Sequence, residues 1–190
     1  MSAPDAGSGP ESALEDFLVE RARAGDREAL GALYDRFAPR ILAFARGMLG
    51  SREDAEEVVT DAFIAAFRFA RDLRSSRSFG GWMLRVARNQ CLDRLRQPRL
   101  LTLPLEETSA PVHWPLPPRD ELDRLGLRIH LEQALEQLPP DQRAVLLLRD
   151  AQQFSVREVS TVLERSEAAV RSLHLRARRW LRKALEELDA

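Results

Sequence analysis

Cysteine, lysine and histidine are scarce in this chain of 190 residues, which has one cysteine, one lysine and three histidines. The lone Cys91 excludes a disulfide framework and a cysteine-based metal site. No run of eighteen apolar residues occurs, so a membrane-spanning helix is excluded. Residues 1–12 lack the cationic start and apolar stretch of a secretion signal. We therefore expect a protein of the reducing cytoplasm that does not enter membranes.

The motifs of common enzyme classes are also missing. The sequence contains no phosphate-cradling glycine loop, no His-Glu metal helix and no Cys-His constellation. We therefore expect no enzyme and no cofactor. Of the 29 basic residues, 28 are arginine, which a GC-rich genome explains more simply than phosphate binding does.

Positive charge is concentrated in two short stretches of a chain whose formal net charge is −1. Residues 71–99 hold eight Arg against two Asp, and residues 165–183 hold six Arg and one Lys against one Glu, so each stretch carries +6. The remainder therefore carries −13. Two cationic surfaces on an otherwise acidic chain suit a polyanionic partner, although two solvated arginine-rich helix faces would give the same pattern.

Helical periodicity dominates the sequence, and no long alternation or hairpin signal indicates strands. Three capping boxes predict helix starts: Ser12 with Glu15, Ser51 with Asp54, and Ser155 with Glu158. A further apolar-periodic stretch runs from Asp26 to Leu49. We expect Pro39 to bend it or to begin its second half, and Gly50 to end it.

A proline-rich segment divides the chain, because six of the eleven prolines fall in residues 97–122. Such a segment neither propagates a helix nor pairs as a central strand. We therefore interpret it as a semi-extended tether between two helical domains. We predict an all-α chain of two small helical domains. Their bounds are a disordered tail at 1–11, a first domain at 12–97, a linker at 98–125 and a second domain at 126–190.

The first basic stretch predicts a helix from Ser78 to Gln97. Its buried side would comprise Phe79, Met83, Val86, Ala87, Cys91 and Leu95. The opposite side would present Trp82, Arg85 and Asn89, flanked by Arg88 and Arg96. An indole, guanidinium groups and an amide are suited to unstacked bases and phosphates. Alternatively, Trp82 is half-buried against the preceding helix and Arg85 is only solvated.

The preceding helix, from Ser51 to about Leu73, is acidic on one side. Its buried side would comprise Val59, Phe63, Ala66, Phe67 and Ala70, and Asp54, Glu57 and Asp61 would share the opposite side with Val58. Acidic residues in the first turns of a helix suit its dipole. An acidic edge that includes an apolar residue is equally consistent with a docking surface for a basic partner helix.

Residues 155–188 predict two helices joined by a tight turn, the pattern of a helix-turn-helix. The second helix would bury a stripe that contains Val170, His174 and Ala177. Its outer side would present Ala168, Arg171, Ser172, Leu175, Arg176 and Arg179. Small residues near the helix start would permit close approach to a DNA major groove, where Arg171 and Arg176 could reach guanine edges or phosphates.

Three sequence blocks together resemble bacterial sigma factors of the extracytoplasmic-function (ECF) group. They are SREDAEEVVTDAFIAAFRFA (51–70), FGGWMLRVARNQCLDRLRQ (79–97) and the stretch 131–185, which includes LPPDQRAVLLLRD. The resemblance implies a region 2-like domain at 12–97, which binds core RNA polymerase and the −10 promoter element. It also implies a region 4-like domain at 126–190, which binds the −35 element.

The resemblance assigns roles to the candidate residues. Core RNA polymerase would meet Asp54, Glu57, Val58 and Asp61. The separated −10 strand of promoter DNA would meet Trp82, Arg85, Arg88, Asn89 and Arg96, and the −35 duplex would meet Ala168, Arg171, Ser172 and Arg176. Regulation by an anti-sigma factor is a further expectation from the family.

Two departures from the family pattern concern the second domain. Glu164 stands where the family has glycine in the turn, and a non-glycine residue in a left-handed conformation costs about 1 kcal/mol. The recognition helix reads Leu173, His174, Leu175, which places His174 inside and Leu175 outside. We expect His174 to be neutral and bonded to the backbone, with a pH sensor as the alternative. Both departures raise the possibility of weak −35 binding.

The sequence therefore predicts an ECF-type sigma factor that binds core RNA polymerase and directs promoter recognition, strand opening and initiation. A stand-alone helix-turn-helix regulator is one alternative. A degenerate relative that sequesters polymerase or an anti-sigma factor is another.

Overall fold

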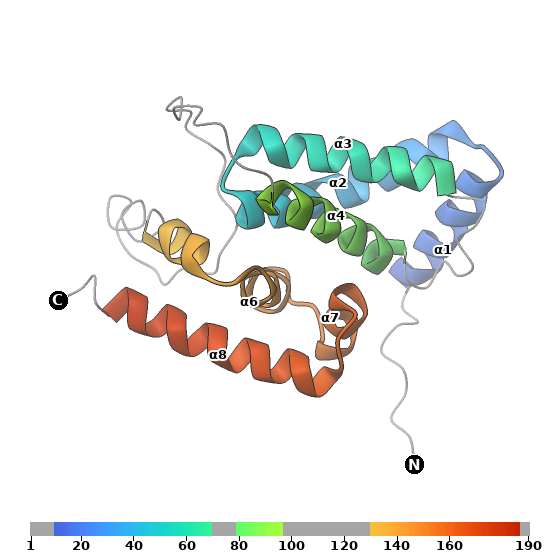
Figure 1. Ribbon diagram of the computed structural model, residues 1–190. Helices are drawn as coiled ribbons and strands as arrows, with labels where there is room; N and C mark the ends of the chain where they lie inside the picture. Colours follow the sequence, from blue (N-terminus) through green and yellow to red (C-terminus); the bar gives the residue numbers. More distant parts are fainter. Residues whose placement is uncertain (1–9, 70–78, 97–129, 187–190) are drawn as a thin grey trace, which may run out of the picture.

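The regular elements of this computed structural model are all helical within the residues that it describes, which are 10–69, 79–96 and 130–186 (Figure 1). The predicted all-α class is thereby confirmed. The predicted linker at 98–125 lies outside the described residues. The predicted tail at 1–11 extends too far, because helix α1 begins at Pro10.

Four helices form the N-terminal unit: α1 (Pro10–Arg23), α2 (Arg27–Leu49), α3 (Arg52–Phe69) and α4 (Phe79–Arg96). Helix α2 contacts each of the other three, so it lies at the centre of the unit. It also supplies four of the largest fully buried side chains, which are Phe44, Leu33, Ile41 and Met48. The position of α4 is therefore fixed by a large apolar core rather than by its own polar residues.

Local signals explain most of the helix ends in this unit. The Asp26 carboxylate accepts hydrogen bonds from two backbone N–H groups and begins α2, and Gly50, at φ 74°, ends it. The Ser51 hydroxyl accepts a bond from the Asp54 N–H at 3.2 Å, as predicted. The predicted cap at Ser12 is wrong, because that residue lies inside α1. Pro39 lies inside α2, which is continuous from Arg27 to Leu49, so the expectation that Pro39 begins a second half is wrong.

The C-terminal unit begins with a helical segment at 130–137, followed by α6 (Pro140–Leu146), which continues directly into a π-helical turn, η3 (Leu147–Ala151). Helices α7 (Val156–Leu163) and α8 (Glu167–Glu186) complete the unit. The predicted capping box of Ser155 and Glu158 is present. The Ser166 hydroxyl accepts from the Ala169 N–H at 3.2 Å and caps α8. Together, α7 and α8 form the predicted helix-turn-helix.

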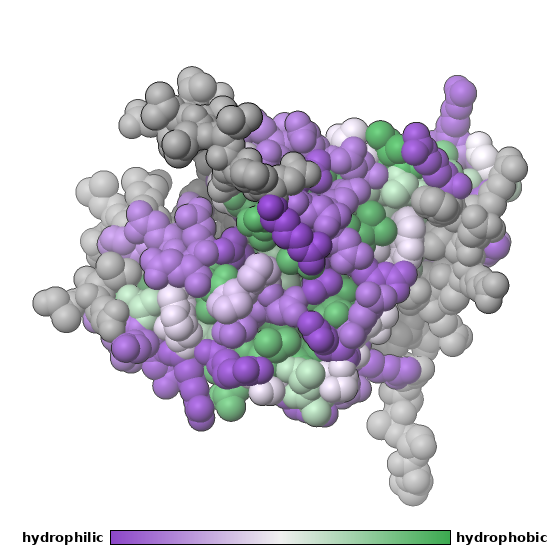
Figure 2. Space-filling view, viewed as in Figure 1, coloured by the Kyte–Doolittle hydropathy of each residue, from purple (hydrophilic) through white to green (hydrophobic). Residues whose placement is uncertain are grey.

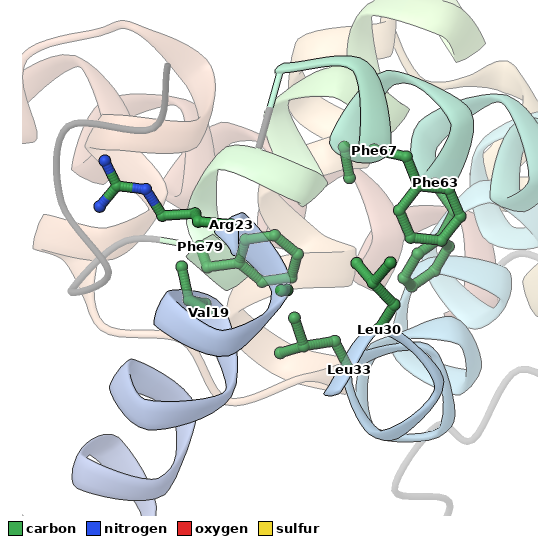
Figure 3. Close-up of a pocket in the computed structure, with 9 residues that line it drawn as sticks. Val19, Arg23, Leu30, Leu33, Phe63, Phe67 and Phe79 are labelled. Carbon is green, nitrogen blue, oxygen red and sulfur yellow. The ribbon is translucent and has the colours of Figure 1, made fainter. Parts of the chain in front are cut away.

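A small apolar cavity lies where α1, α2, α3 and the start of α4 meet, between Val19, Leu33, Phe63 and Phe79 (Figure 3). Phe67 stands at its edge and is 48% exposed, so the prediction that Phe67 belongs to the buried side of α3 is wrong. Its ring lies 6.2 Å from that of Phe63, at the end of α3, where the covering helices no longer reach it completely. We attribute the cavity to core packing.

The two units pack directly against each other, and their buried residues form one continuous core. Helix α4 contacts α7, while α2 contacts α6 and η3 (Figure 1). At Gly47 the approach is so close that an added Cβ would lie 2.5 Å from a methyl group of Leu147. The guanidinium of Arg143 donates to the Met48 carbonyl oxygen at 2.5 Å and thereby joins α6 to the end of α2. The C-terminal unit thus packs directly against the N-terminal unit, to which α4 belongs.

Candidate nucleic-acid and polymerase interfaces

The predicted −10 face of α4 is partly covered. Trp82 is half-buried, and its ring lies 6.3 Å from the ring of Phe79. Asn89 and Arg96 are exposed, and Arg96 pairs with Asp93 of the same helix at 3.0 Å. Of the two interpretations of Trp82, the half-buried one therefore describes its packing in this conformation. The end of α4 at Arg96 remains open to solvent.

Arg85 and Arg88 do not point freely into solvent, because both form ion pairs with the C-terminal unit. Arg85 pairs with Glu164 at 3.2 Å, and Arg88 pairs with Asp141 at 2.5 Å. Arg88 is only 8% exposed, so the expectation that it flanks an open nucleic-acid face is wrong for this conformation. The covering segment lies far along the sequence from α4, which is why helical periodicity alone placed Arg88 at the surface.

Asp141 is the centre of this contact. Its second carboxylate oxygen accepts from Arg165, in the turn before α8, at 3.0 Å. Burial alone would raise the pKa of Asp141, but the hydrogen bonds and charges of Arg88 and Arg165 outweigh it and lower the pKa below its usual value. One carboxylate is therefore held ionised between two guanidinium groups.

The acidic edge of α3 is present but differs from the prediction. Glu57 and Asp61 are exposed, and both contact Arg94 of α4, at 3.5 Å and 2.9 Å. Asp54 lies beside the helix start, where its N–H is capped. Val58 is fully buried, so its expected place on this edge is wrong. Helix α3 packs against both α2 and α4, and a helix covered from two sides buries a wider sector than one stripe.

The outer side of α8 agrees with the prediction. Ala168, Arg171, Ser172 and Arg176 are all exposed, and Leu175 between them is 53% exposed. Arg171 pairs with Glu167 at 3.1 Å, and Arg176 bonds to the Ser172 carbonyl oxygen at 3.3 Å. These partners belong to α8 itself, so the face is available for docking.

In Figure 2, hydrophilic residues dominate the visible surface, and hydrophobic ones appear between them in patches.

The two departures from the family pattern, at Glu164 and His174, both lie within the described residues. Glu164 adopts the left-handed conformation, φ 53° and ψ 43°, that the family pattern implied for this position. His174 is mostly buried, as expected, but Nε2 lies 2.9 Å from the Asp150 carboxylate rather than a backbone group. The expectation of a backbone partner is therefore wrong. The π-helical turn η3 brings Asp150 to α8, and that local geometry has no signal in the sequence.

Several residues that the sequence reasoning missed connect the units. Asp141 and Glu164 hold α4, Gln152 donates to the Arg40 carbonyl oxygen at 2.9 Å, and Arg40 lies 4.6 Å above the ring of Phe154. None of these pairs is close in sequence, so no motif could have indicated them.

Two further findings concern the single thiol and the search for metal sites and membrane spans. The thiol of Cys91 is buried, and burial raises its pKa to about 12, so it is a poor nucleophile or metal ligand at neutral pH. Within the described ranges, no helix has the length and apolar character that would let it span a bilayer, and no group of His, Cys, Asp and Glu could hold a metal ion.

Comparison with known proteins gives two family matches, one for each unit. Residues 33–100 match Sigma-70 region 2, and residues 128–188 match Sigma-70, region 4. The first match covers α3 and α4, and the second covers the helix-turn-helix. The order of the two matches along the chain is the order in which the two predicted domains occur.

Curated relatives match most of the chain. The ECF RNA polymerase sigma factor SigM of Mycobacterium tuberculosis is 32% identical over 167 residues, which is 87% of this chain and 82% of that protein. The RNA polymerase sigma-H factor of Pseudomonas aeruginosa is 30% identical and covers 90% of this chain and 93% of its own.

Solved structures share the fold. CnrH, in complex with the cytosolic domain of CnrY, is 26% identical, with a TM-score of 0.71 over 93% of this chain and 99% of CnrH. The sigma factor RpoE of Bartonella quintana, in complex with the anti-sigma factor NepR, has a TM-score of 0.59 at 20% identity, covering 79% of this chain and 92% of its own. With both sigma regions present in order and relatives aligned over most of its length, this chain belongs to the sigma-70 family, in the ECF group of RNA polymerase sigma factors.

Proposed function

We propose that this protein is the promoter-specificity subunit of a bacterial RNA polymerase. It binds the core enzyme, directs it to a set of promoters and stabilises the opened strands, while bond formation remains with the core enzyme. The observation that carries the proposal is the presence of both sigma regions on one chain, with the outer side of α8 exposed. The protein would act in the cytoplasm, where its partners are promoter DNA, core polymerase and an anti-sigma factor.

The core enzyme would contact the acidic edge of α3, through Asp54, Glu57 and Asp61. Glu57 and Asp61 have side chains that are 70% and 50% exposed even while they hold Arg94. Carboxylates at an exposed helix edge complement a basic partner helix. Val58 supports this edge from inside the core.

The separated −10 strand would contact α4 through Trp82, Arg85, Arg88, Asn89 and Arg96. Unstacking a base step costs a few kcal/mol, and stacking one base on an aromatic ring returns about 1–3 kcal/mol. Trp82 would supply that ring, and the arginines would neutralise phosphates. The −35 duplex would contact Ala168, Arg171, Ser172 and Arg176 of α8, whose first turn offers small side chains at the groove.

Promoter-directed transcription with purified core polymerase tests the proposal, on promoters identified by sequencing transcript 5′ ends after overexpression. Trp82→Ala should bind core enzyme normally but open promoters poorly, and Trp82→Phe, which keeps a stacking ring, should retain much of the activity. Thermal unfolding of both variants controls for the packing of Trp82 on Phe79. If the parent protein binds DNA as a dimer and gains nothing from core polymerase, the proposal fails and the stand-alone regulator replaces it.

A further inference from the structure

One polar side chain interrupts the apolar inner side of α8. His174 shares that side with Val170, Ala177 and Leu181, which are buried, and its own side chain is only 18% exposed. A polar group removed from water needs a hydrogen-bond partner in the protein. The partner of His174 is Asp150 of η3, whose Oδ1 lies 2.9 Å from Nε2.

The hydrogen bond between these side chains has a defined direction. An ionised carboxylate only accepts hydrogen bonds, so the imidazole donates through Nε2. A neutral ring with its hydrogen on Nε2 and a protonated ring both meet this requirement. The contact between Asp150 and His174 therefore does not depend on which of the two forms is present.

The π-helical turn η3 presents Asp150 to α8, and its own residues hold it in shape. The Gln152 N–H donates to the Leu147 carbonyl oxygen at 3.0 Å, which is the wide spacing of a π-turn. The Gln153 side chain donates to the Asp150 carbonyl oxygen at 2.8 Å, and Gln153 has a left-handed backbone with φ 60°. Both π-turns and non-glycine residues in this conformation cluster at functional sites. These two features therefore direct attention to Asp150.

Asp150 contacts two successive turns of α8. Its Oδ1 meets His174, and its Oδ2 lies 3.9 Å from Nε of Arg178, one turn further along the helix. At about 100° per residue, Arg178 is displaced from His174 toward the outer side, where Arg171 and Leu175 lie. The carboxylate thus stands at the border between the inner and outer sides. A contact at this border opposes rotation of α8 about its own axis.

We propose that Asp150 is a positioning residue for promoter readout: acting through His174, it holds α8 at the rotation in which its outer side faces the base edges of the −35 duplex. This rests on the proposed function, because it takes the outer side of α8 as the reader of that element. Hydrogen bonds to base edges weaken steeply when their geometry changes, whereas attraction to phosphates falls off gradually with distance. Loss of the contact therefore lowers discrimination between DNA sequences more than it lowers overall affinity.

The first test separates the hydrogen bond from the charge of Asp150. Asp150→Asn and Asp150→Ala remove the same charge, but only asparagine keeps a side-chain oxygen that accepts from His174. Fluorescence anisotropy of the intact chain with a −35 duplex, and with a scrambled duplex of equal length, gives a discrimination ratio. We expect Asp150→Ala to lower this ratio severalfold and Asp150→Asn to retain most of it. Glu186→Gln removes an equal charge from the exposed end of the same helix and should leave the ratio unchanged.

The second test separates positioning from support of the fold. His174→Leu completes the apolar inner side of α8, and exchanging a buried polar contact for apolar packing is often neutral or stabilising. We expect this variant to unfold at the same temperature as the parent or higher, but to lose as much of the discrimination ratio as Asp150→Ala. The double variant should lose no more than either single one, because both substitutions break the same contact. A residue that only supported the fold would lower the ratio and the unfolding temperature together.

The outcomes separate this positioning role from the sigma function. The positioning role is refuted if Asp150→Ala or His174→Leu keeps the ratio of the parent, if Asp150→Asn loses as much as Asp150→Ala, or if the two single losses add in full. A parent chain that does not distinguish the two duplexes would refute it as well. Promoter-directed transcription with core polymerase is a different assay, and its absence would refute the proposed function without reference to these ratios.

Discussion

The two basic stretches, 71–99 and 165–183, carry equal charge in the sequence, but the helices within them, α4 and α8, stand in different environments. Helix α4 holds its arginines against carboxylates of the other unit, and Arg88 is buried in the process. Helix α8 keeps Arg171 and Arg176 exposed, with partners only one turn away on α8 itself. Equal charge therefore does not mean equal access: the outer side of α8 is exposed, whereas Arg85 and Arg88 of α4 are held by carboxylates of the other unit.

The largest expected difference between the helices is in stability. Arg88→Ala leaves the partly buried carboxylate of Asp141 with Arg165 alone, and breaking a buried ion pair costs about 3–5 kcal/mol, which partial exposure reduces to about 2 kcal/mol. Arg171→Ala removes an exposed pair and should change the free energy of unfolding by less than about 0.5 kcal/mol. Urea unfolding of the two variants measures both. Equal destabilisation would contradict the comparison.

For duplex DNA affinity we expect the opposite order, with a larger effect for Arg171→Ala than for Arg88→Ala. Arg171→Ala should lower affinity for −35 duplex and reduce the slope of log affinity against log salt by about one phosphate contact, because the side chain is exposed and ready to bind. Arg88→Ala should leave duplex affinity unchanged. Fluorescence anisotropy at several salt concentrations gives both slopes, and a salt slope that Arg171→Ala does not alter would argue against the recognition-helix assignment.

The turn residue Glu164 should have a smaller effect, because two contributions oppose each other. Glu164→Gly removes left-handed strain of about 1 kcal/mol but also removes the exposed pair with Arg85, which contributes about 0–1 kcal/mol. Glu164→Gln removes the charge and keeps the strain. We expect the glycine variant to unfold at a higher urea concentration than the glutamine variant. The reverse order would mean that the turn is not strained.

The smallest effect concerns pH. Asp141 has a lowered pKa in the folded protein, so the stability that its charge contributes is complete above the ordinary value of 3.8 and is lost as pH falls through the folded pKa, which lies below 3.8. The difference in unfolding free energy between the parent and Asp141→Asn should therefore be constant from pH 8 to pH 5 and decline only in stronger acid. Subtracting the variant cancels the contributions of the groups that the substitution leaves in place. A difference that changes near neutral pH would implicate another titratable group in the contact of Asp141 with Arg88 and Arg165.

Local features of the fold were predictable because they depend on neighbouring residues. Caps at Ser51 and Ser155 each involve a hydroxyl and an N–H three residues away, and the outer side of α8 follows from helical periodicity. The left-handed Glu164 followed from its place in the family pattern.

Features that depend on distant residues were not predictable. Val58 is buried because α3 is covered from two sides, and Arg88 is buried because Asp141 reaches it from 53 residues along the chain. His174 meets Asp150 only because of the π-helical turn. Periodicity gives the direction of each side chain but not the element that lies opposite it.

The burial of Arg88 also affects nonspecific binding to other nucleic acids in the cell. A bacterial cell contains abundant messenger and ribosomal RNA. An exposed basic helix with an aromatic ring would bind single-stranded stretches of this RNA without sequence specificity. While Glu164 and Asp141 hold Arg85 and Arg88, this conformation offers such RNA the exposed arginines of α8 but withholds these two of α4.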